Sequence, residues 1–228
     1  MIGGMNVGAF GVDGTRFDIL DIVKDGLVLH LDANKRGRCE PSVWYDSSSY
    51  SKNCVLTDVA FRDSYNGLLF NGITSVGTVP QISVTDLTCS VWVLPINVAS
   101  PVIQNPVSGS SLFEYMAIRS LKLNWYTGSN WREINVALKN NVYYYMTWRS
   151  QVIAGVANNS LFLNGIKGFS GTDSLIGGNF TKVGSHPSPA EMRFLNGVMG
   201  KVELYNRALT DEEVLYNYNV NRGLYAKY

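Results

Sequence analysis

The side chains able to act as acids, bases or nucleophiles are scattered along this chain of 228 residues. Hydrolysis of a glycosidic bond needs two carboxylates about 5–10 Å apart, which in a strand means acids two or four positions apart. Glu114, Glu133, Glu191 and Glu203 each stand alone among apolar or basic neighbours. The dense acids Asp211 to Glu213 are explained by the start of a helix. We therefore expect no catalytic carboxylate pair and a protein that is not an enzyme.

The histidines and cysteines lack the spacing of a catalytic or zinc site. His30 and His186 lie outside any nucleophile-elbow sequence, so we interpret the first as a structural strand residue and the second as a loop residue. Cys89 lies within an apolar strand, as a core residue would. Cys39 and Cys54 flank one loop, which leaves two alternatives: free thiols, which we favour, or a disulfide in an oxidising compartment.

Loop carboxylates are too widely spaced to predict a metal site. Calcium takes about six to eight oxygen ligands, commonly from closely spaced acids in one loop. The available loop acids are Asp32, Asp46, Asp58 and Asp63, and none of them belongs to a D-x-D-x-D-G sequence. We expect no required metal and no other cofactor.

One aromatic segment has the composition of a carbohydrate-binding surface. Sugars stack their apolar faces on aromatic rings, while neighbouring polar groups bind the hydroxyls. The candidate platform consists of Trp125, Tyr126, Asn130, Trp131 and Arg132. In the alternative, Trp125 faces the core because it alternates with Leu121 and Leu123. Tyr126 and Trp131 would then be rim or subunit-contact residues.

The overall composition favours a packed domain with no strong electrostatic field. The chain is 46% hydrophobic, 12% aromatic and only 16% charged. Nineteen basic residues face eighteen acidic ones, so no net field attracts nucleic acid or an anionic membrane. No apolar run approaches the length of a membrane span. The N-terminus lacks the basic start and apolar stretch of a secretory signal, so we expect a protein made in the cytoplasm.

The elements that must position these residues are mainly strands. The pattern from residue 27 to 32 has period two, with Leu27, Leu29 and Leu31 on one face. Similar runs recur at 87–94, 121–126, 142–148, 160–163 and 200–205. Asn-Gly, which suits tight type I′ turns, occurs at residues 66–67, 71–72, 164–165 and 196–197. The turn at 164–165 gives the best predicted hairpin. We also expect strand 27–32 to pair near strand 200–206, which brings the chain ends together.

The two ends of the chain have distinct predicted roles. Residues 1–24 are Gly-containing and weakly patterned, which predicts an arm for anchoring or assembly, followed by one sandwich domain over 25–228. Near the other end, Thr210 and Glu213 form a capping box, and Leu209 can pack on Val214 as a hydrophobic staple. The predicted helix runs over about residues 211–218.

Short segments spread over this domain form a recognisable series. They are Asp25-Gly-Leu-Val-Leu-His-Leu-Asp-Ala33, Trp44-Tyr-Asp46, Phe70-Asn-Gly72, Thr88-Cys-Ser-Val-Trp92, Leu161-Phe-Leu-Asn-Gly165, Phe194-Leu-Asn-Gly197 and residues 200–213. The series resembles the laminin-G-like, concanavalin A-like jelly rolls over about residues 25–226. Its most specific part is Y-N-R-A-L-T-D-E-E at residues 205–213. The resemblance implies an all-β, antiparallel two-sheet jelly-roll sandwich with one short helix near the C-terminus.

The opening D-G-L-V-L-H-L-D-A followed by W-Y-D is more similar to the version of this domain in tailed-bacteriophage structural proteins than to animal laminin domains. This similarity implies a virion protein, such as a capsid decoration, head fibre or tail appendage. Its partners would be other virion proteins, further copies of itself and, as a candidate ligand, a host glycan. The segment between Ala33 and Trp44 departs from the usual Gly- and Tyr-rich spacer, so no function is carried over to it. Two alternatives are a lectin-like adhesion module and an endoglycosidase, which this fold also supports.

Overall fold

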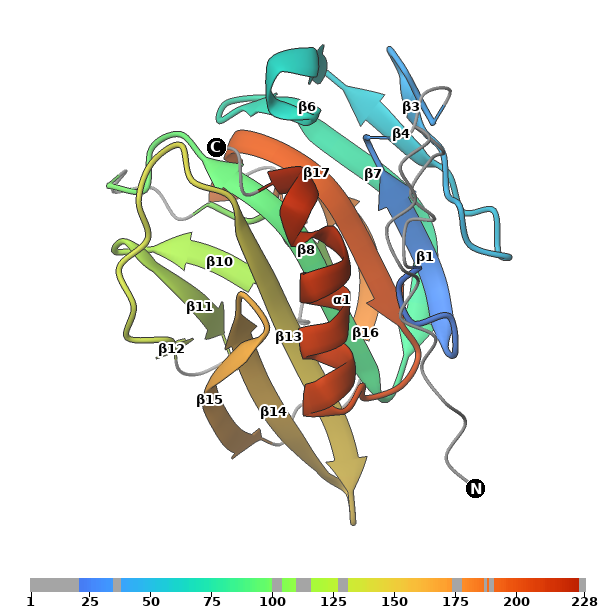
Figure 1. Cartoon of the computed structure of the whole chain (residues 1–228), viewed down its shortest axis with the longest axis vertical. Coiled ribbons are helices and arrows are strands. Elements are labelled where there is room, and N and C mark those ends of the chain that lie inside the picture. The colour runs from blue at the N-terminus through green and yellow to red at the C-terminus, as the bar shows by residue number, and fades with distance from the viewer. Residues whose placement is uncertain are drawn as a thin grey trace, which may run out of the picture.

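The computed structural model describes residues 21–34, 38–99, 104–109, 116–126, 131–173, 178–186, 188 and 191–225. Most of these residues belong to antiparallel strands, and the helix α1 (Asp211–Tyr225) lies across one face of the largest sheet (Figure 1). No helix in the described ranges has the length and hydrophobicity needed to cross a membrane. The architecture confirms the predicted all-β, two-layer sandwich.

An eight-stranded antiparallel sheet forms one layer, in the order β15-β14-β13-β8-β17-β6-β5, with β1 also paired to β17. Its strands are β1 (Leu27–Asp32), β5 (Ala60–Arg62), β6 (Gly67–Asn71), β8 (Leu87–Pro95), β13 (Tyr144–Ile153), β14 (Val156–Leu163), β15 (Ile166–Asp173) and β17 (Asn196–Tyr205). A short 3-10 helix, η1 (Asp63–Tyr65), connects β5 to β6.

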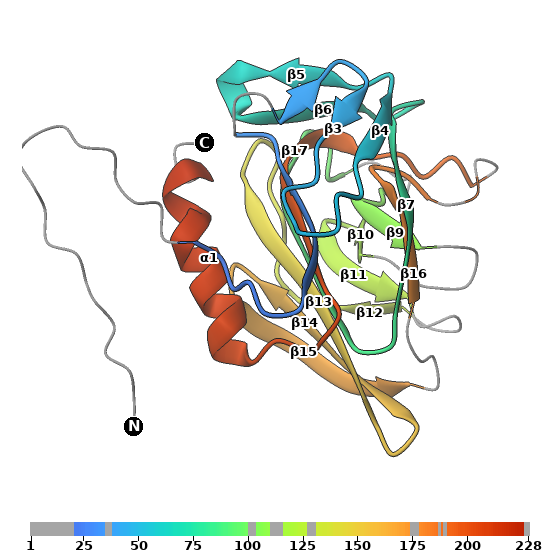
Figure 2. The same cartoon turned by 90° about the vertical axis from the view of Figure 1, so that its right-hand side faces the viewer.

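Two smaller sheets form the opposite layer. The six-stranded sheet, in the order β2-β3-β4-β7-β16-β9, contains β2 (Cys39–Glu40), β3 (Val43–Trp44), β4 (Cys54–Thr57), β7 (Val76–Val84), β9 (Val107–Gly109) and β16 (Gly178–Val183). The three-stranded sheet contains β10 (Met116–Arg119), β11 (Lys122–Tyr126) and β12 (Trp131–Glu133). Figure 2 shows both smaller sheets on the side of the eight-stranded sheet that faces away from α1.

The eight-stranded sheet is buried on both faces. The larger hydrophobic cluster fills the space between the layers, where Val91 and Trp148 pack with Trp44 and Trp125 of the smaller sheets. The second cluster lies under α1, where Trp92 stacks on Tyr225 with ring centroids 4.4 Å apart. Since both faces are covered, every residue of β8 is buried.

The register confirms the main predicted pairings. Strand β1 pairs antiparallel with β17, from Leu27 opposite Tyr205 to Asp32 opposite Lys201. The predicted turn at residues 164–165 joins β14 to β15, with φ angles of 52° at Asn164 and 78° at Gly165. The Asn-Gly at residues 196–197 does not form a turn, because it begins β17 instead. A Cβ atom at Gly197 would lie 2.5 Å from the Leu94 carbonyl oxygen, so glycine serves close strand approach there.

The helix is longer than the sequence predicts. The capping box is present, since Thr210 Oγ1 accepts the Glu213 N–H at 3.2 Å and Glu213 Oε2 accepts the Thr210 N–H at 2.8 Å. The expected end at residue 218 is wrong, because α1 continues to Tyr225. The extra turns are held by tertiary contacts: the Asn221 side chain is buried and accepts a hydrogen bond from Lys201.

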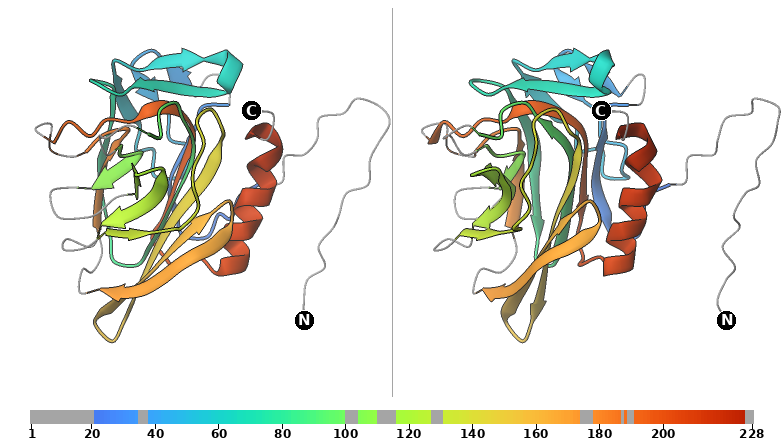
Figure 3. Two further views of the ribbon diagram at one scale, coloured as in Figure 1. Left: turned by 90° about the vertical axis from the view of Figure 1, so that its left-hand side faces the viewer. Right: turned by 60° about the vertical axis from the view of Figure 1, so that its left-hand side comes forward.

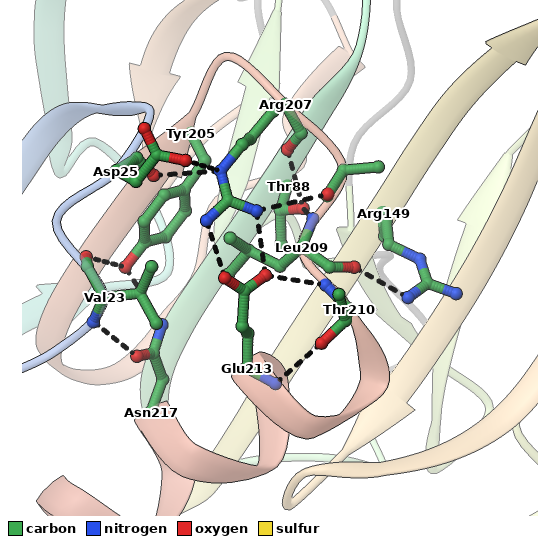
Figure 4. A network of polar contacts seen from close by, with 11 residues as sticks. Val23, Asp25, Thr88, Arg149, Tyr205, Arg207, Leu209, Thr210, Glu213 and Asn217 are labelled. Carbon is green, nitrogen blue, oxygen red and sulfur yellow. Dashed lines mark hydrogen bonds and ion pairs between the residues drawn. The ribbon is translucent and has the colours of Figure 1, made fainter. Parts of the chain in front are cut away.

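The family-specific block at residues 205–213 docks this helix on the sheet (Figure 4). The Arg207 guanidinium donates two hydrogen bonds to the Glu213 carboxylate, at 2.8 and 2.7 Å, and forms an ion pair with Asp25 at 2.9 Å. The Thr88 hydroxyl donates to the Arg207 carbonyl and accepts the Leu209 N–H. The block is therefore a structural clamp between the helix, β8 and the start of the domain.

The segment before β1 is part of the packed structure. Residues 1–20 of the predicted arm lie outside the described residues. Ile22 is buried in the cluster under α1, and the Val23 N–H donates to Asn217 Oδ1 at 2.9 Å. Contacts of the sandwich thus begin a few residues before the predicted boundary at residue 25.

Candidate functional site

The predicted platform residues belong to the three-stranded sheet. Strands β10 and β11 are joined by a hairpin in which Ser120 and Leu121 have φ angles of 49° and 66°. This hairpin places Arg119 directly opposite Lys122. Strand β12 then pairs with β11, with Trp131 opposite Tyr126. In Figure 3 these strands are yellow-green and lie on the side of the molecule away from α1.

Alternation along β11 separates the aromatic residues between two faces. Leu123 and Trp125 point into the core, where Trp125 is only 2% exposed and stacks on Trp148 with ring centroids 5.9 Å apart. Trp125 is therefore a core residue, as the alternative interpretation proposed, and it does not line the surface. Leu121 departs from that alternation, because it lies in the turn and is 39% exposed.

The opposite face of the sheet carries an aromatic pair. Tyr126 and Trp131 are both half-buried, with ring centroids 4.9 Å apart and an interplanar angle of 36°. The Arg119 guanidinium lies over the Trp131 ring, with Cζ 5.1 Å from its centroid. Such a contact contributes about 0.5–1 kcal/mol at an exposed site. The contact places Arg119 of β10 beside the aromatic pair formed by Tyr126 of β11 and Trp131 of β12.

Charged and amide side chains complete this face. Lys122 and Glu133 form an ion pair at 2.6 Å. Between the hairpin and the aromatic pair, Asn124 is buried and donates to the carbonyls of Arg119 and Lys122 at 2.9 Å each. We call the surface made by Arg119, Lys122, Tyr126, Trp131 and Glu133 the aromatic face.

The remaining predicted platform residues do not share this arrangement. Arg132 is exposed but lies opposite Trp125 in the register, so alternation directs it to the other side of the sheet from Trp131. Asn130 lies outside the described residues. Sequence reasoning missed Arg119, Lys122 and Glu133 as neighbours of the aromatic pair. The two basic residues that flank Ser120-Leu121 were the available signal, but this dipeptide is not a recognised turn sequence.

The isolated glutamates occupy very different environments. Glu133 and Glu191 are each ion-paired, to Lys122 at 2.6 Å and to Arg193 at 2.7 Å, whereas Glu114 lies outside the described residues. Glu203 is fully buried between β17 and α1. Sequence reasoning placed Glu203 among apolar neighbours, and the fold adds polar groups from distant strands.

Those polar groups only partly compensate the buried carboxyl. The Tyr145 hydroxyl donates to Glu203 Oε2 at 2.7 Å, but Oε1 has no hydrogen-bond partner among the described residues. Nearby, Lys201 Nζ lies 3.1 Å from Asp32 Oδ2. Burial raises the pKa of Glu203 from 4.5 to about 7, although Lys201 and the Tyr145 hydrogen bond both lower it. Enclosed in this way, Glu203 has no access to a substrate.

Among the loop acids, Asp46 acts as a structural acceptor. Asp46 Oδ1 accepts the backbone N–H groups of His30 and Ser48 at 2.9 and 2.8 Å. Its Oδ2 accepts the backbone N–H of Lys52 at 2.8 Å and the Ser48 hydroxyl at 2.7 Å. This network explains the W-Y-D segment, because it ties the loop after β3 to β1. Within the described ranges, no group of three or more acids, histidines and cysteines could hold a metal ion.

The three cysteines are free thiols; Cys54 and Cys89 are buried, and Cys39 is partly buried against the core. Cys39 and Cys54 both lie opposite Trp44 on the two strands that flank it. Two strand spacings separate them by roughly 10 Å, beyond the Cα separation of about 7 Å that a disulfide allows. Burial is the main cause that raises the pKa of each thiol to about 12.

Comparison with known proteins agrees with this architecture. A family model described as the concanavalin A-like lectin/glucanases superfamily matches residues 71–215, which is more than half of the chain. No curated protein sequence matches this chain.

Several solved structures share the fold at low sequence identity. Trypanosoma rangeli sialidase, in complex with 2,3-difluorosialic acid, aligns with a TM-score of 0.66 and 16% identity over 87% of this chain. This chain spans only 33% of that sialidase. Domain 4 of AbnA, a GH43 extracellular arabinanase from Geobacillus stearothermophilus in complex with arabinotriose, aligns with a TM-score of 0.61 and 16% identity over 86% of this chain and 100% of that domain. The binding domain of Paraclostridial Mosquitocidal Protein 1 aligns with a TM-score of 0.61 and 19% identity, covering 86% of this chain and 52% of the other.

Proposed function

Because the chain belongs to the concanavalin A-like lectin/glucanases superfamily, we propose that it is a non-catalytic carbohydrate-binding module. The binding surface in this proposal is the aromatic face of the three-stranded sheet. The observation that carries it is the pair formed by Tyr126 and Trp131, two half-buried rings 4.9 Å apart on an outer face. Half-buried rings flanked by charged side chains suit the apolar face and the polar substituents of a sugar ring.

The state of the described glutamates supports the non-catalytic part of the proposal. A glycosidase needs a carboxyl that donates a proton and a second carboxylate across the bond. On the aromatic face, Glu133 is held by Lys122 at 2.6 Å and has no second carboxylate in its ion-pair network. Incubation with capsular polysaccharides and a reducing-end assay should detect no release of sugar. Release that survives purification of the folded chain would contradict this part.

Glycan binding is tested with an array followed by calorimetry on the strongest ligand. Trp131→Ala and Tyr126→Ala should each weaken binding about tenfold, because each removes one stacking surface. The matched control is Tyr216→Ala, which removes a partly exposed tyrosine from α1, on the other side of the eight-stranded sheet. Binding that is unaffected by the first two variants would exclude this surface as the site, and no binding at millimolar concentrations would contradict the proposed function.

We further propose that the module is carried on a tailed-phage particle as a capsid decoration, head fibre or tail appendage. The support is the sequence similarity of residues 25–33 and 44–46 to phage structural proteins. Such a module would assemble with other virion proteins and with copies of itself. Mass spectrometry of gradient-purified virions should detect the chain at stoichiometric levels. Virions without it would exclude this role and leave the glycan-binding proposal intact.

A further inference from the structure

The aromatic face brings two cations directly opposite each other. Arg119 and Lys122 are register partners across the β10–β11 hairpin, so their side chains leave the same face of the sheet. Like charges directly opposite each other on neighbouring strands are destabilising. The Glu133 ion pair and the Trp131 contact offset part of this repulsion, and a bound anion would offset the rest.

Only one of the two cations has an internal counter-ion. Glu133 neutralises Lys122 at 2.6 Å. No described carboxylate lies within ion-pair distance of Arg119, whose guanidinium instead lies over the Trp131 ring at 5.1 Å. Among the described residues of this face, one positive charge is therefore left without a compensating carboxylate. The whole chain carries a formal charge of only +1, so this charge is local and does not belong to a generally basic surface.

The position of Arg119 also suits a planar anion. A guanidinium keeps its N–H donors in its own plane and binds a carboxylate through two parallel hydrogen bonds. The contact with the Trp131 ring holds the guanidinium beside the aromatic pair, which lowers the entropy cost of binding. A sugar ring that contacts Tyr126 and Trp131 would then carry its carboxylate toward Arg119.

From these observations we infer that the aromatic face binds acidic saccharides, with Arg119 as the residue that selects for the carboxylate. The inference rests on the proposed carbohydrate-binding function and specifies the class of ligand. Tyr126 and Trp131 provide affinity for the sugar ring, which a neutral saccharide shares. Arg119 provides the discrimination, while Glu133 limits how many anionic groups the face accepts.

The test compares acidic saccharides with neutral partners that carry a hydroxymethyl group in place of each carboxylate. Two pairs serve as probes: α1,4-linked trigalacturonate with α1,4-galactotriose, and sialyllactose with the same saccharide after reduction of its carboxyl group. Calorimetry should give at least about tenfold tighter binding for an acidic member than for its neutral partner, and added salt should weaken that preference. A hexaglutamate peptide is the control for charge alone and should bind more weakly than the preferred saccharide.

Variants locate the preference. Arg119→Gln should remove the preference for the acidic member, measured as the ratio of the two affinities, and Arg119→Lys should restore it in part because the charge returns without the planar fork. Arg62→Gln, which removes a guanidinium from the exposed edge strand β5, is the matched control and should change neither. Thermal melts of all three variants confirm that they fold.

Each outcome separates the inference from the proposed function. Equal binding of acidic and neutral members, or a preference that survives in Arg119→Gln, overturns the inference while the carbohydrate-binding function stands. Hexaglutamate binding as tightly as the best saccharide also overturns it, because charge alone would then explain the affinity. If no saccharide on a full array binds, the proposed function fails and the inference fails with it.

Discussion

Glu203 provides a quantitative test of the packing between α1 and the eight-stranded sheet. The carboxyl is fully buried, and its pKa rises from 4.5 to about 7 mainly because burial disfavours the charged form. Between pH 4.5 and about pH 7, Glu203 therefore stays protonated in the folded protein, whereas the same carboxyl in the unfolded chain has released its proton. The stability that this proton contributes is complete below about pH 4.5 and is lost as the pH rises through about 7.

The size of the effect follows from the shift. Each pKa unit corresponds to about 1.4 kcal/mol, so a shift of roughly two to three units amounts to about 3 kcal/mol. Glu203→Gln keeps the side-chain shape, and its amide oxygen can still accept the Tyr145 hydroxyl. Since the amide does not ionise, this variant should be more stable than the natural chain by about 3 kcal/mol above neutral pH.

The assay is urea unfolding followed by tryptophan fluorescence at several pH values from about 5 to 8. Other groups near Glu203 titrate or carry charge, namely His30, Asp32, Lys201 and Tyr205. Taking the difference between natural chain and variant at each pH reduces their contribution. Glu212→Gln removes an exposed carboxyl and should leave the pH dependence unchanged. A Glu203→Gln variant with unchanged pH dependence, or lower stability at high pH, would refute the reasoning.

Three further substitutions test local features by the same unfolding measurement. Leu121→Gly should raise the free energy of unfolding by about 1 kcal/mol, because Leu121 has a φ of 66° and is exposed; a decrease would contradict the strain. Thr210→Ala should lower it by about 1 kcal/mol, since the hydroxyl caps the Glu213 N–H, and an unchanged value would exclude a capping role. Gly200→Ala should lower it by about 2 kcal/mol, because the new Cβ would lie 2.4 Å from the Tyr225 ring; full tolerance would show that this ring moves easily.

Local sequence rules predicted those parts of the fold that depend on neighbouring residues. Alternation identified β1, and the turn at Asn164-Gly165 was recognisable because a two-residue loop needs positive φ at both positions. The capping box located the start of α1 for the same reason, since Thr210 and Glu213 lie three residues apart.

Features that depend on distant residues could not be predicted. Nothing in the local pattern extends α1 past residue 218, because its last turns are held by contacts of Asn221 with Lys201 and of Tyr225 with Trp92. The outer face of the eight-stranded sheet carries buried aromatic residues such as Trp92 and Tyr145 because this helix covers it. Glu203 acquires Tyr145 as a partner for the same reason, through strand pairings that join residues far apart in the chain.

The candidate site was predicted only in part. Tyr126 and Trp131 were identified because their aromatic character is visible in the sequence. Arg119 was missed because the Ser120-Leu121 turn adopts positive φ angles without the glycine or asparagine that usually indicates a hairpin. Without that turn, nothing in the sequence brings β10 beside β11.

The central claim, that the aromatic face binds a carbohydrate, is tested most directly by NMR of the tryptophan indole N–H groups during a saccharide titration. The chain has five tryptophans. Trp44, Trp92, Trp125 and Trp148 are buried, and Trp131 is half-buried on the aromatic face. The signal of Trp131 should shift progressively and saturate, while the other four stay nearly unchanged. Saturable saccharide binding that leaves the Trp131 signal in place would contradict the claim.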